Sequence, residues 1–469
     1  MKTSMAENEV NPSSIDNIPY EILNQIVSLI PLKEAVKTII LSSSWKHIWT
    51  PIQAILNIDN YDRITSHESG QRMNHFISTF LNTYESSYQM LNISLAKPKG
   101  GVGQETLFLK AIKGVEKELY ITFHDQQNPK LPFSLPIQLS LCDKNDNFCY
   151  LKTLHLRSIT SHAGSFLPEL FSGCRNLETL SLERCNWLQD IELKAHDSLL
   201  QKFVVLDCEK MASVTISLAP NLKCFVYRGT LVKIVVKEVP KLCDVTLNFK
   251  GVCEVSDFES CEDDLVLLLA SLKDIEVLTL SGWFLEWLCT RGVAFDDFEF
   301  KFNKLKELSW MDGCMTKQKR DSLACFLSLT PSLENLFIKI DEKWSTIQNP
   351  YFHQSWPQVW TVKSKDWQLE HLKMVKFFGF KIKEENENLV WLMDLLLKKA
   401  IVIKKMSVIE PESKVSWWVA KVPQTHLKKM ASTTTTSSCY SSRSSLILSL
   451  NHKCCFQLTP VNDNKKLML

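Results

Sequence analysis

Between residues 151 and 341, short segments recur in which apolar and polar positions alternate. Each segment has the form L-x-x-L-x-L, in which other apolar residues can replace leucine. Alternation with a period of two places the apolar side chains on one face of a β-strand and the polar ones on the other. The eight copies are LKTLHLRS (151–158), LETLSLERC (177–185), LQKFVVLDC (200–208), LKCFVYRGT (222–230), LCDVTLNFK (242–250), IEVLTLSGW (275–283), LKELSWMDG (305–313) and LENLFIKID (333–341).

The spacing of these segments indicates a repeat array. Their starts are separated by 26, 23, 22, 20, 33, 30 and 28 residues. Five of these intervals lie within the range of about 20–29 residues that is usual for leucine-rich repeats. One repeat cannot bury its leucines, whereas a stack of repeats can. With weaker copies at 91–96 and 119–124, the sequence predicts an α/β fold, a leucine-rich-repeat solenoid (horseshoe) over 91–345.

The polar positions of these strands are candidates for binding a partner. In the first segment Leu154 and Leu156 point into the core, and the residues between them point outward. The charges on this outward face have both signs, which favours a protein or peptide partner over nucleic acid; a small molecule between array and partner stays open. The candidate substrate-binding residues are His155, Arg157, Glu183, Arg228, Asn248, Glu307 and Phe337.

Two cysteines, Cys185 and Cys208, follow their strands at the position where such repeats carry Asn or Cys. A small buried polar group there bonds backbone groups of the neighbouring coil. No His or Cys follows either residue at the spacing of metal ligands. The sequence therefore predicts structural cysteines and no metal site.

The N-terminal region has a different, helical period. Residues 1–15 are polar and are expected to be disordered. In 16–56, Pro19 suits the first turn of a helix, and apolar residues follow at helical spacing. Pro31 and Pro51 end the first and third of three short predicted helices. Because a unit this small buries little of its apolar surface, we expect it to present an apolar face to another protein or to the rest of the chain.

The remaining segments divide as follows. Residues 57–90 are predicted to form a helical connector. Within 346–425, LKMVKFFGF (372–380) predicts a strand, and 387–409 predicts an amphipathic helix followed by a second strand. Residues 426–469 are predicted to be a disordered tail, because 432–445 is almost entirely Ser and Thr.

Composition narrows the class of protein. The formal net charge is +2, which provides no electrostatic reason for binding nucleic acid or an anionic membrane. The fifteen cysteines include no C-x-x-C pair, the start of the chain has no apolar signal core, and no apolar run reaches the length of a spanning helix. We therefore expect a reduced protein of the cytoplasm and/or nucleus, without membrane contact.

No catalytic motif is present in the sequence. It contains no G-x-S-x-G, H-E-x-x-H or G-x-x-x-x-G-K. KGGVG (99–103) follows a proline and is not followed by G-K-[ST], which predicts a loop rather than a phosphate site. The sequence predicts no catalytic residue, no cofactor and no enzyme activity.

Residues 16–56 resemble an F-box, and the parts after them resemble those of plant F-box/FBD/leucine-rich-repeat proteins. The F-box features occur in order: an L-P-like start at Ile18 and Pro19, Glu21 to Leu23, the K-x-A-V of the second helix, and Trp45 with Trp49. The FBD-like segment is carried by the strand 372–380, the helix after it and the K-M strand. It implies a strand-helix-strand cap at the end of the array.

The resemblance implies a substrate-receptor subunit of an SCF-type ubiquitin ligase. Its F-box would dock a Skp-family adaptor linked to a cullin–RING ligase, and its repeats would hold a protein substrate that the sequence does not identify. The adaptor-binding residues implied are Ile18, Pro19, Ile22, Leu23, Ile26, Leu32, Val36, Leu41, Trp45 and Trp49.

A second hypothesis is a leucine-rich-repeat interaction scaffold with a weak or non-functional F-box. Ser43 and Ser44 stand where the family usually has a basic residue, and Tyr20 is bulky. Binding of the adaptor distinguishes the two hypotheses.

Overall fold

The computed structural model describes residues 18–19, 22–23, 26, 55–59, 88–96, 115–124, 147–158, 166–186, 188–252, 261–341, 367–380, 387–411, 416–421, 446–450 and 454–460. The chain divides into two compact units. The first contains Met1–Gln189, Lys194–Val204 and Cys208–Lys210, and the second contains Asp190–Leu193, Val205–Asp207 and Met211–Leu469.

In the first unit, five parallel strands lie side by side in chain order. They are β1 (Ile55–Asp59), β2 (Tyr88–Ala96), β3 (Val115–His124), β4 (Thr153–Arg157) and β5 (Thr179–Glu183). The short helices η3 (Asn147–Tyr150) and α6 (Phe166–Gly173) connect the later strands. Leu154 and Leu156 of β4 are buried and pair in register with buried Leu180 and Leu182 of β5, as the leucine spacing predicts.

In the second unit the same pattern continues over seven parallel strands. They are β9 (Cys224–Leu231), β11 (Asp244–Val252), β12 (Val277–Ser281), β13 (Glu307–Asp312), β14 (Asn335–Ile340), β15 (Met374–Phe378) and β16 (Lys405–Ile409). With β7 (Lys202–Leu206), each of the eight predicted repeat segments contains one strand. The prediction of parallel repeat strands is therefore confirmed, and the parallel sheet is consistent with a solenoid.

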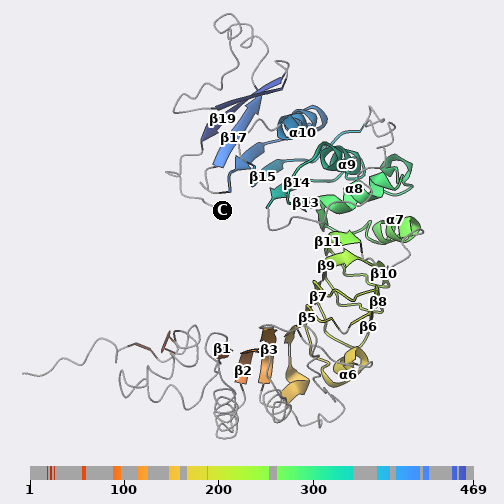
Figure 1. Ribbon diagram of the computed structural model, residues 1–469, viewed down its shortest axis with the longest axis vertical. Helices are drawn as coiled ribbons and strands as arrows, with labels where there is room; N and C mark the ends of the chain where they lie inside the picture. Colours follow the sequence, from red (N-terminus) through yellow and green to blue (C-terminus); the bar gives the residue numbers. More distant parts are fainter. Residues whose placement is uncertain are drawn as a thin grey trace, which may run out of the picture. The chain divides into compact units, whose positions relative to one another are not determined.

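Helices cover one side of this sheet (Figure 1). They are α7 (Cys261–Ser271), α8 (Gly282–Thr290), η5 (Phe295–Asp297), α9 (Lys317–Leu327) and α10 (Glu387–Lys399). The longer repeat intervals accommodate α7, α8 and α9. Among the described helices, none has both the length and the apolar character needed to cross a membrane.

A repeated backbone contact joins each coil to the one before it. The N–H groups of Lys306 and Glu307 both donate to the carbonyl of Glu276, at 2.8 and 3.1 Å. The next coil repeats the contact, because Glu334 and Asn335 both donate to the carbonyl of Lys306 at 2.9 Å. These forked bonds satisfy backbone groups at the start of each strand and hold the strands in register.

A second, three-stranded sheet was not predicted. Its strands are β6 (Asp190–Lys194), β8 (Ser213–Ser217) and β10 (Lys233–Lys237). Val214 and Ile216 of β8 are buried and flanked by partly exposed residues. The three segments recur at the interval of the leucine-rich strands, and that period is the signal that would have identified them.

Strands occupy parts of three segments that were predicted to be helical or disordered. The ends of the predicted connector, 57–59 and 88–90, belong to β1 and β2, and the last residues of the predicted F-box, 55–56, belong to β1. In the predicted tail, β18 (Leu446–Leu450) and β19 (Cys454–Pro460) form an antiparallel pair, and β19 also pairs with β17 (Ser416–Lys421). The disorder prediction is wrong for these strands, because the backbone of β19 pairs with β17 on one side and with β18 on the other.

The sheet also does not end at the predicted cap. The strand, helix and strand of the FBD-like segment are present as β15, α10 and β16. However, β16 pairs with β17 in antiparallel orientation, and the sheet continues through β19 and β18. The predicted second and third F-box helices, the middle of the connector and the Ser/Thr-rich segment lie outside the described residues.

Candidate functional site

Side chains that alternate with the buried leucines form the open face of the sheet. In the second unit this face lies opposite α8, which packs against β11, β12 and β13. Its residues are partly exposed on most strands, as in the alternating burial of β9. Six of the seven predicted substrate-binding residues are partly exposed on this face.

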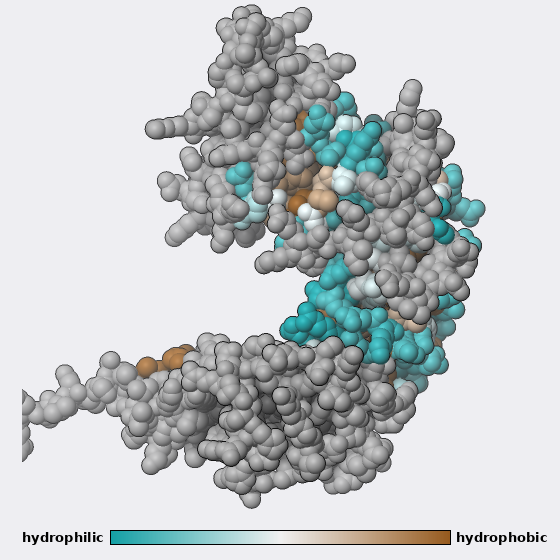
Figure 2. Space-filling view, viewed as in Figure 1, coloured by the Kyte–Doolittle hydropathy of each residue, from teal (hydrophilic) through white to brown (hydrophobic). Residues whose placement is uncertain are grey.

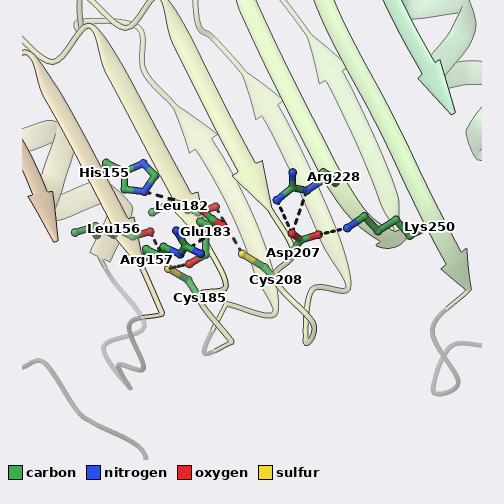
Figure 3. Close-up of polar contacts among 10 residues, drawn as sticks. All are labelled: His155, Leu156, Arg157, Leu182, Glu183, Cys185, Asp207, Cys208, Arg228 and Lys250. Atoms are coloured by element: carbon green, nitrogen blue, oxygen red, sulfur yellow. Dashed lines mark hydrogen bonds and ion pairs between the residues drawn. The ribbon is translucent and has the colours of Figure 1, made fainter. Parts of the chain in front are cut away.

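In the first unit, three predicted residues come together on the open face. The carboxylate of Glu183 lies 3.5 Å from Nε of Arg157 and 3.9 Å from Nε2 of His155 (Figure 3). Burial lowers the pKa of His155, although the charge of Glu183 opposes this effect. The ring of Tyr120 on β3 lies 5.8 Å from the His155 ring, which limits how the imidazole can turn.

In the second unit, Arg228 belongs to a cluster centred on Asp207. The Asp207 carboxylate accepts a hydrogen bond from Nε of Arg228 at 3.0 Å and one from Nζ of Lys250 at 2.9 Å (Figure 3). Burial alone would raise the pKa of Asp207, but the two bonds and the two positive charges lower it below its ordinary value. Asp207 and Lys250 were not predicted as site residues, although strand alternation places Lys250 on the outward side.

Asn248 was predicted to present its amide to solvent, and this prediction is wrong. The residue is only 3% exposed, and its Nδ2 has no hydrogen-bond partner among the residues that the structure describes. Asn248 pairs in register with Arg228. Because neighbouring strands lie about 4.8 Å apart, a short side chain is shielded by longer neighbours. Asn248 is therefore a buried polar residue beneath this face and not an exposed contact.

Glu307 and Phe337 lie on adjacent strands of the second unit. Glu307 of β13 pairs with Asn335, and Ser309 two residues later pairs with Phe337 of β14. Both predicted residues are partly exposed, and the ring of Phe337 lies 6.4 Å from that of Phe378 on β15.

The two cysteines after β5 and β7 are buried and structural, as predicted. The thiol of Cys185 lies 3.5 Å from the carbonyl oxygen of Leu156, and the thiol of Cys208 lies 3.9 Å from that of Leu182. Each thiol thus contacts a carbonyl of the preceding coil. Within the described part of the chain, no group of His, Cys, Asp and Glu is arranged to hold a metal ion.

Five of the ten predicted adaptor-binding residues are described. Ile22 and Ile26 are helical, lie one turn apart, and are 46% and 39% exposed. The carbonyl of Pro19 accepts hydrogen bonds from the N–H groups of Ile22 and Leu23, at 3.0 and 3.1 Å. Ile18 is half-buried and Pro19 is exposed.

Leu23 differs from its neighbours, because it is only 2% exposed. It packs inside the protein itself and does not form part of an exposed adaptor surface in this conformation. The other five predicted residues, Leu32, Val36, Leu41, Trp45 and Trp49, lie outside the described residues.

Two family models match the chain. The F-box domain model matches residues 15–51, and the model described as At1g61320/AtMIF1, LRR domain, matches residues 140–445. The second match covers more than half of the chain.

Relatives from Arabidopsis thaliana share the same combination of parts. The chain is 26% identical over 309 residues to putative F-box/LRR-repeat protein At3g18150, covering 61% of this chain and 64% of that protein, just under two thirds of its length. It is 24% identical over 334 residues to F-box/LRR-repeat protein At5g02910, covering 69% and 71%. It is 23% identical over 386 residues to F-box/FBD/LRR-repeat protein At1g13570, covering 76% and 85%. The chain therefore belongs to the plant F-box/LRR-repeat family with leucine-rich repeats of the At1g61320/AtMIF1 type.

Proposed function

We propose that this protein is the substrate-receptor subunit of an SCF-type ubiquitin ligase. The observation that carries the proposal is the match of an F-box domain at residues 15–51, followed by leucine-rich repeats over 140–445. In this arrangement one part binds a Skp-family adaptor and the other binds a protein substrate. The protein would act in the cytoplasm and/or nucleus.

The exposed pair Ile22 and Ile26 supports the first half of the proposal. Large apolar side chains one helical turn apart and exposed on one face favour binding to an apolar groove of another protein. Trp45 and Trp49 would add aromatic anchors, where interface energy concentrates.

The open face of the sheet supports the second half. It carries clusters of charged residues, around Glu183 in one unit and around Asp207 in the other, that are partly exposed. Such groups bind a partner by electrostatic complementarity, which sets specificity. The receptor would accelerate ubiquitin transfer by raising the effective concentration of substrate near the loaded enzyme, and this role needs no catalytic residue of its own.

The alternative is an interaction scaffold whose F-box binds an adaptor weakly or not at all. The observation in its favour is the sequence at Tyr20, Ser43 and Ser44, which departs from the family pattern. The open face would then still bind a partner, but no ubiquitin would be transferred.

A capture experiment tests the proposal. Full-length protein is immobilised, a purified plant Skp-family adaptor is titrated onto it, and the affinity is measured by biolayer interferometry. The variants are Trp45→Ala and the double change Ile22→Asp with Ile26→Asp. Loss of such anchors costs about 2 kcal/mol or more, so each variant is expected to weaken capture by about 30-fold or more.

The matched control is Leu267→Asp, which places the same charge on another large, exposed apolar residue, 66% exposed on α7. It is expected to leave capture unchanged. Capture by the native protein that survives both F-box changes would show that the interface is placed wrongly. No capture by any of several adaptors would favour the scaffold.

A further inference from the structure

Six residues of strands β14 to β17 form a surface that we name the basic aromatic patch. They are Phe337, Lys339, Lys376, Phe378, Lys405 and Trp418. In Figure 2, apolar and hydrophilic residues lie side by side over the strands of this part of the second unit. Every one of the six is partly or fully exposed.

Strand register places these residues together on the open face. Phe337 pairs with Lys376, and Lys339 pairs with Phe378, so aromatic and basic residues alternate between β14 and β15. On the next strands Lys376 pairs with Ser407, and Ser407 pairs with Trp418. Side chains directly opposite each other in register lie on the same face of a sheet.

The lysines lie against the rings. Nζ of Lys339 is 5.9 Å from the ring centroids of both Phe337 and Phe378, and Nζ of Lys376 is 5.9 Å from Phe337. Nζ of Lys405 is 4.8 Å from the ring of Trp418. A cation at this distance is attracted to the ring face and stays beside it. The patch thus combines ordered positive charge with apolar surface.

No acidic side chain neutralises these charges on the strands themselves. The other residues of this face on β14 to β16 are Asn335, Met374, Ser407 and Ile409. Within the described part of the chain, the three lysines form no ion pair. The Asp207 cluster of the same unit differs, because there the carboxylate already pairs with both of its cations.

This chemistry selects the class of ligand. Three ammonium groups favour an anionic partner, and three aromatic rings favour one that also carries apolar side chains. The patch contains no Arg, whose planar fork is the preferred group for bidentate phosphate contacts. Carboxylates of Asp and Glu therefore fit it better than phosphate groups do.

We propose that the basic aromatic patch binds an unmodified acidic peptide segment of a protein partner in which Asp or Glu residues are interspersed with Phe or Leu. This inference deepens the proposed function, on which it rests, by naming the class of substrate segment that the repeats hold.

The test uses synthetic peptides and the full-length protein. The probe is a fluorescein-labelled peptide Gly-Glu-Glu-Phe-Glu-Leu-Glu-Glu-Gly, and binding is followed by fluorescence anisotropy. One control peptide has Gln in place of every Glu, and another has Ala in place of Phe and Leu. We expect each control to bind about tenfold more weakly or worse, and the affinity of the probe to fall as salt is added.

Protein variants link binding to the patch. Changing Lys339, Lys376 and Lys405 together to Gln is expected to weaken binding about tenfold or more, since each exposed pair contributes up to about fivefold. Phe337→Ala is expected to weaken it about fivefold. The matched control Lys301→Gln, an exposed lysine outside these strands, is expected to leave binding unchanged.

Three results would overturn the inference: equal binding of all three peptides, binding unaffected by the lysine changes, or tighter binding of a phosphoserine version or of a twelve-nucleotide uridine RNA at the same lysines. Adaptor capture measured on the same preparations separates the two proposals. If the protein captures the adaptor but does not bind the peptide, the peptide-binding inference is overturned and the proposed receptor role is unaffected. If the protein binds the peptide but does not capture the adaptor, the peptide-binding inference is supported and the protein is an interaction scaffold.

Discussion

Arg228 and Asp207 contact each other through both backbone and side chains. The Asp207 N–H donates to the Arg228 carbonyl at 2.6 Å, and Nε of Arg228 donates to the Asp207 carboxylate at 3.0 Å. Lys250 donates to the same carboxylate. One carboxylate thus connects residues 21 and 43 positions away along the chain.

Replacing this carboxylate is expected to destabilise the second unit. Asp207→Ala leaves Arg228 and Lys250 without their shared partner and should lower the free energy of unfolding by about 1–2 kcal/mol. Urea denaturation followed by circular dichroism measures this. Asp197→Ala, at a carboxylate whose side chain is 79% exposed, is the matched control and should change stability by less than about 0.5 kcal/mol.

The same contact gives a pH dependence. The folded state lowers the pKa of Asp207, so its stabilising contribution is present above the pKa of the unfolded chain and is lost as the pH falls through the folded value. The difference in stability between native protein and Asp207→Ala should therefore shrink in acid. A difference that stays constant between neutral and strongly acidic pH would contradict this account.

The pKa of Glu286 is shifted in the opposite direction to that of Asp207. The side chain of Glu286 lies on α8 and the residue is 4% exposed, and burial raises its pKa, against the attraction of Lys319. The neutral acid is favoured in the folded state, so stability is fully present below the unfolded pKa and is lost as the pH rises through the folded value. Glu286→Gln should remove this loss, and the stability of the variant relative to native protein should increase between acidic and neutral pH. An unchanged difference in urea titrations would refute the burial effect.

Two glycines with positive φ form a matched pair. A Cβ at Gly379 (φ +81°) would overlap the backbone carbonyl of Ile340, whereas a Cβ at Gly292 (φ +91°) meets open space. Gly292→Ala should lower the free energy of unfolding by about 1 kcal/mol, because alanine is strained in the left-handed backbone conformation. Gly379→Ala should lower the free energy of unfolding by about 3 kcal/mol or more, because β14 and the turn after β15 must also move apart. Equal melting temperatures for the two variants would show that the close approach is absent.

Thiol reactivity should follow burial. Burial raises the pKa of Cys325 to about 12 and raises that of Cys289 well above its usual value. Because the thiolate is the reactive form, iodoacetamide at pH 8 should modify exposed Cys314 at least about tenfold faster than either. Mass spectrometry of the digested protein gives the rates, and unfolding in urea should make the three thiols react alike. Fast labelling of Cys289 in the folded protein would be the contrary result.

Sequence alone determined where the strands of the repeats lie and which residues share a face. Leu154, His155 and Leu156 occupy the faces that alternation assigned, because side-chain direction along a strand depends only on local backbone geometry. The family resemblance also came from local order, since the F-box and repeat signatures are short segments of the chain.

The tertiary structure decided what each outward residue contacts. Alternation assigned Asn248 to the open face, but the neighbouring strands bury it, and the helical period could not show that Leu23 is buried while Ile22 and Ile26 are exposed. The basic aromatic patch depends on the register of four strands that lie far apart in the sequence. The strands of the predicted tail likewise depend on pairing, because β19 pairs with both β17 and β18. The burial of a side chain and the pairing of a strand depend on neighbours that folding brings together from distant parts of the chain, and a local sequence pattern does not contain those neighbours.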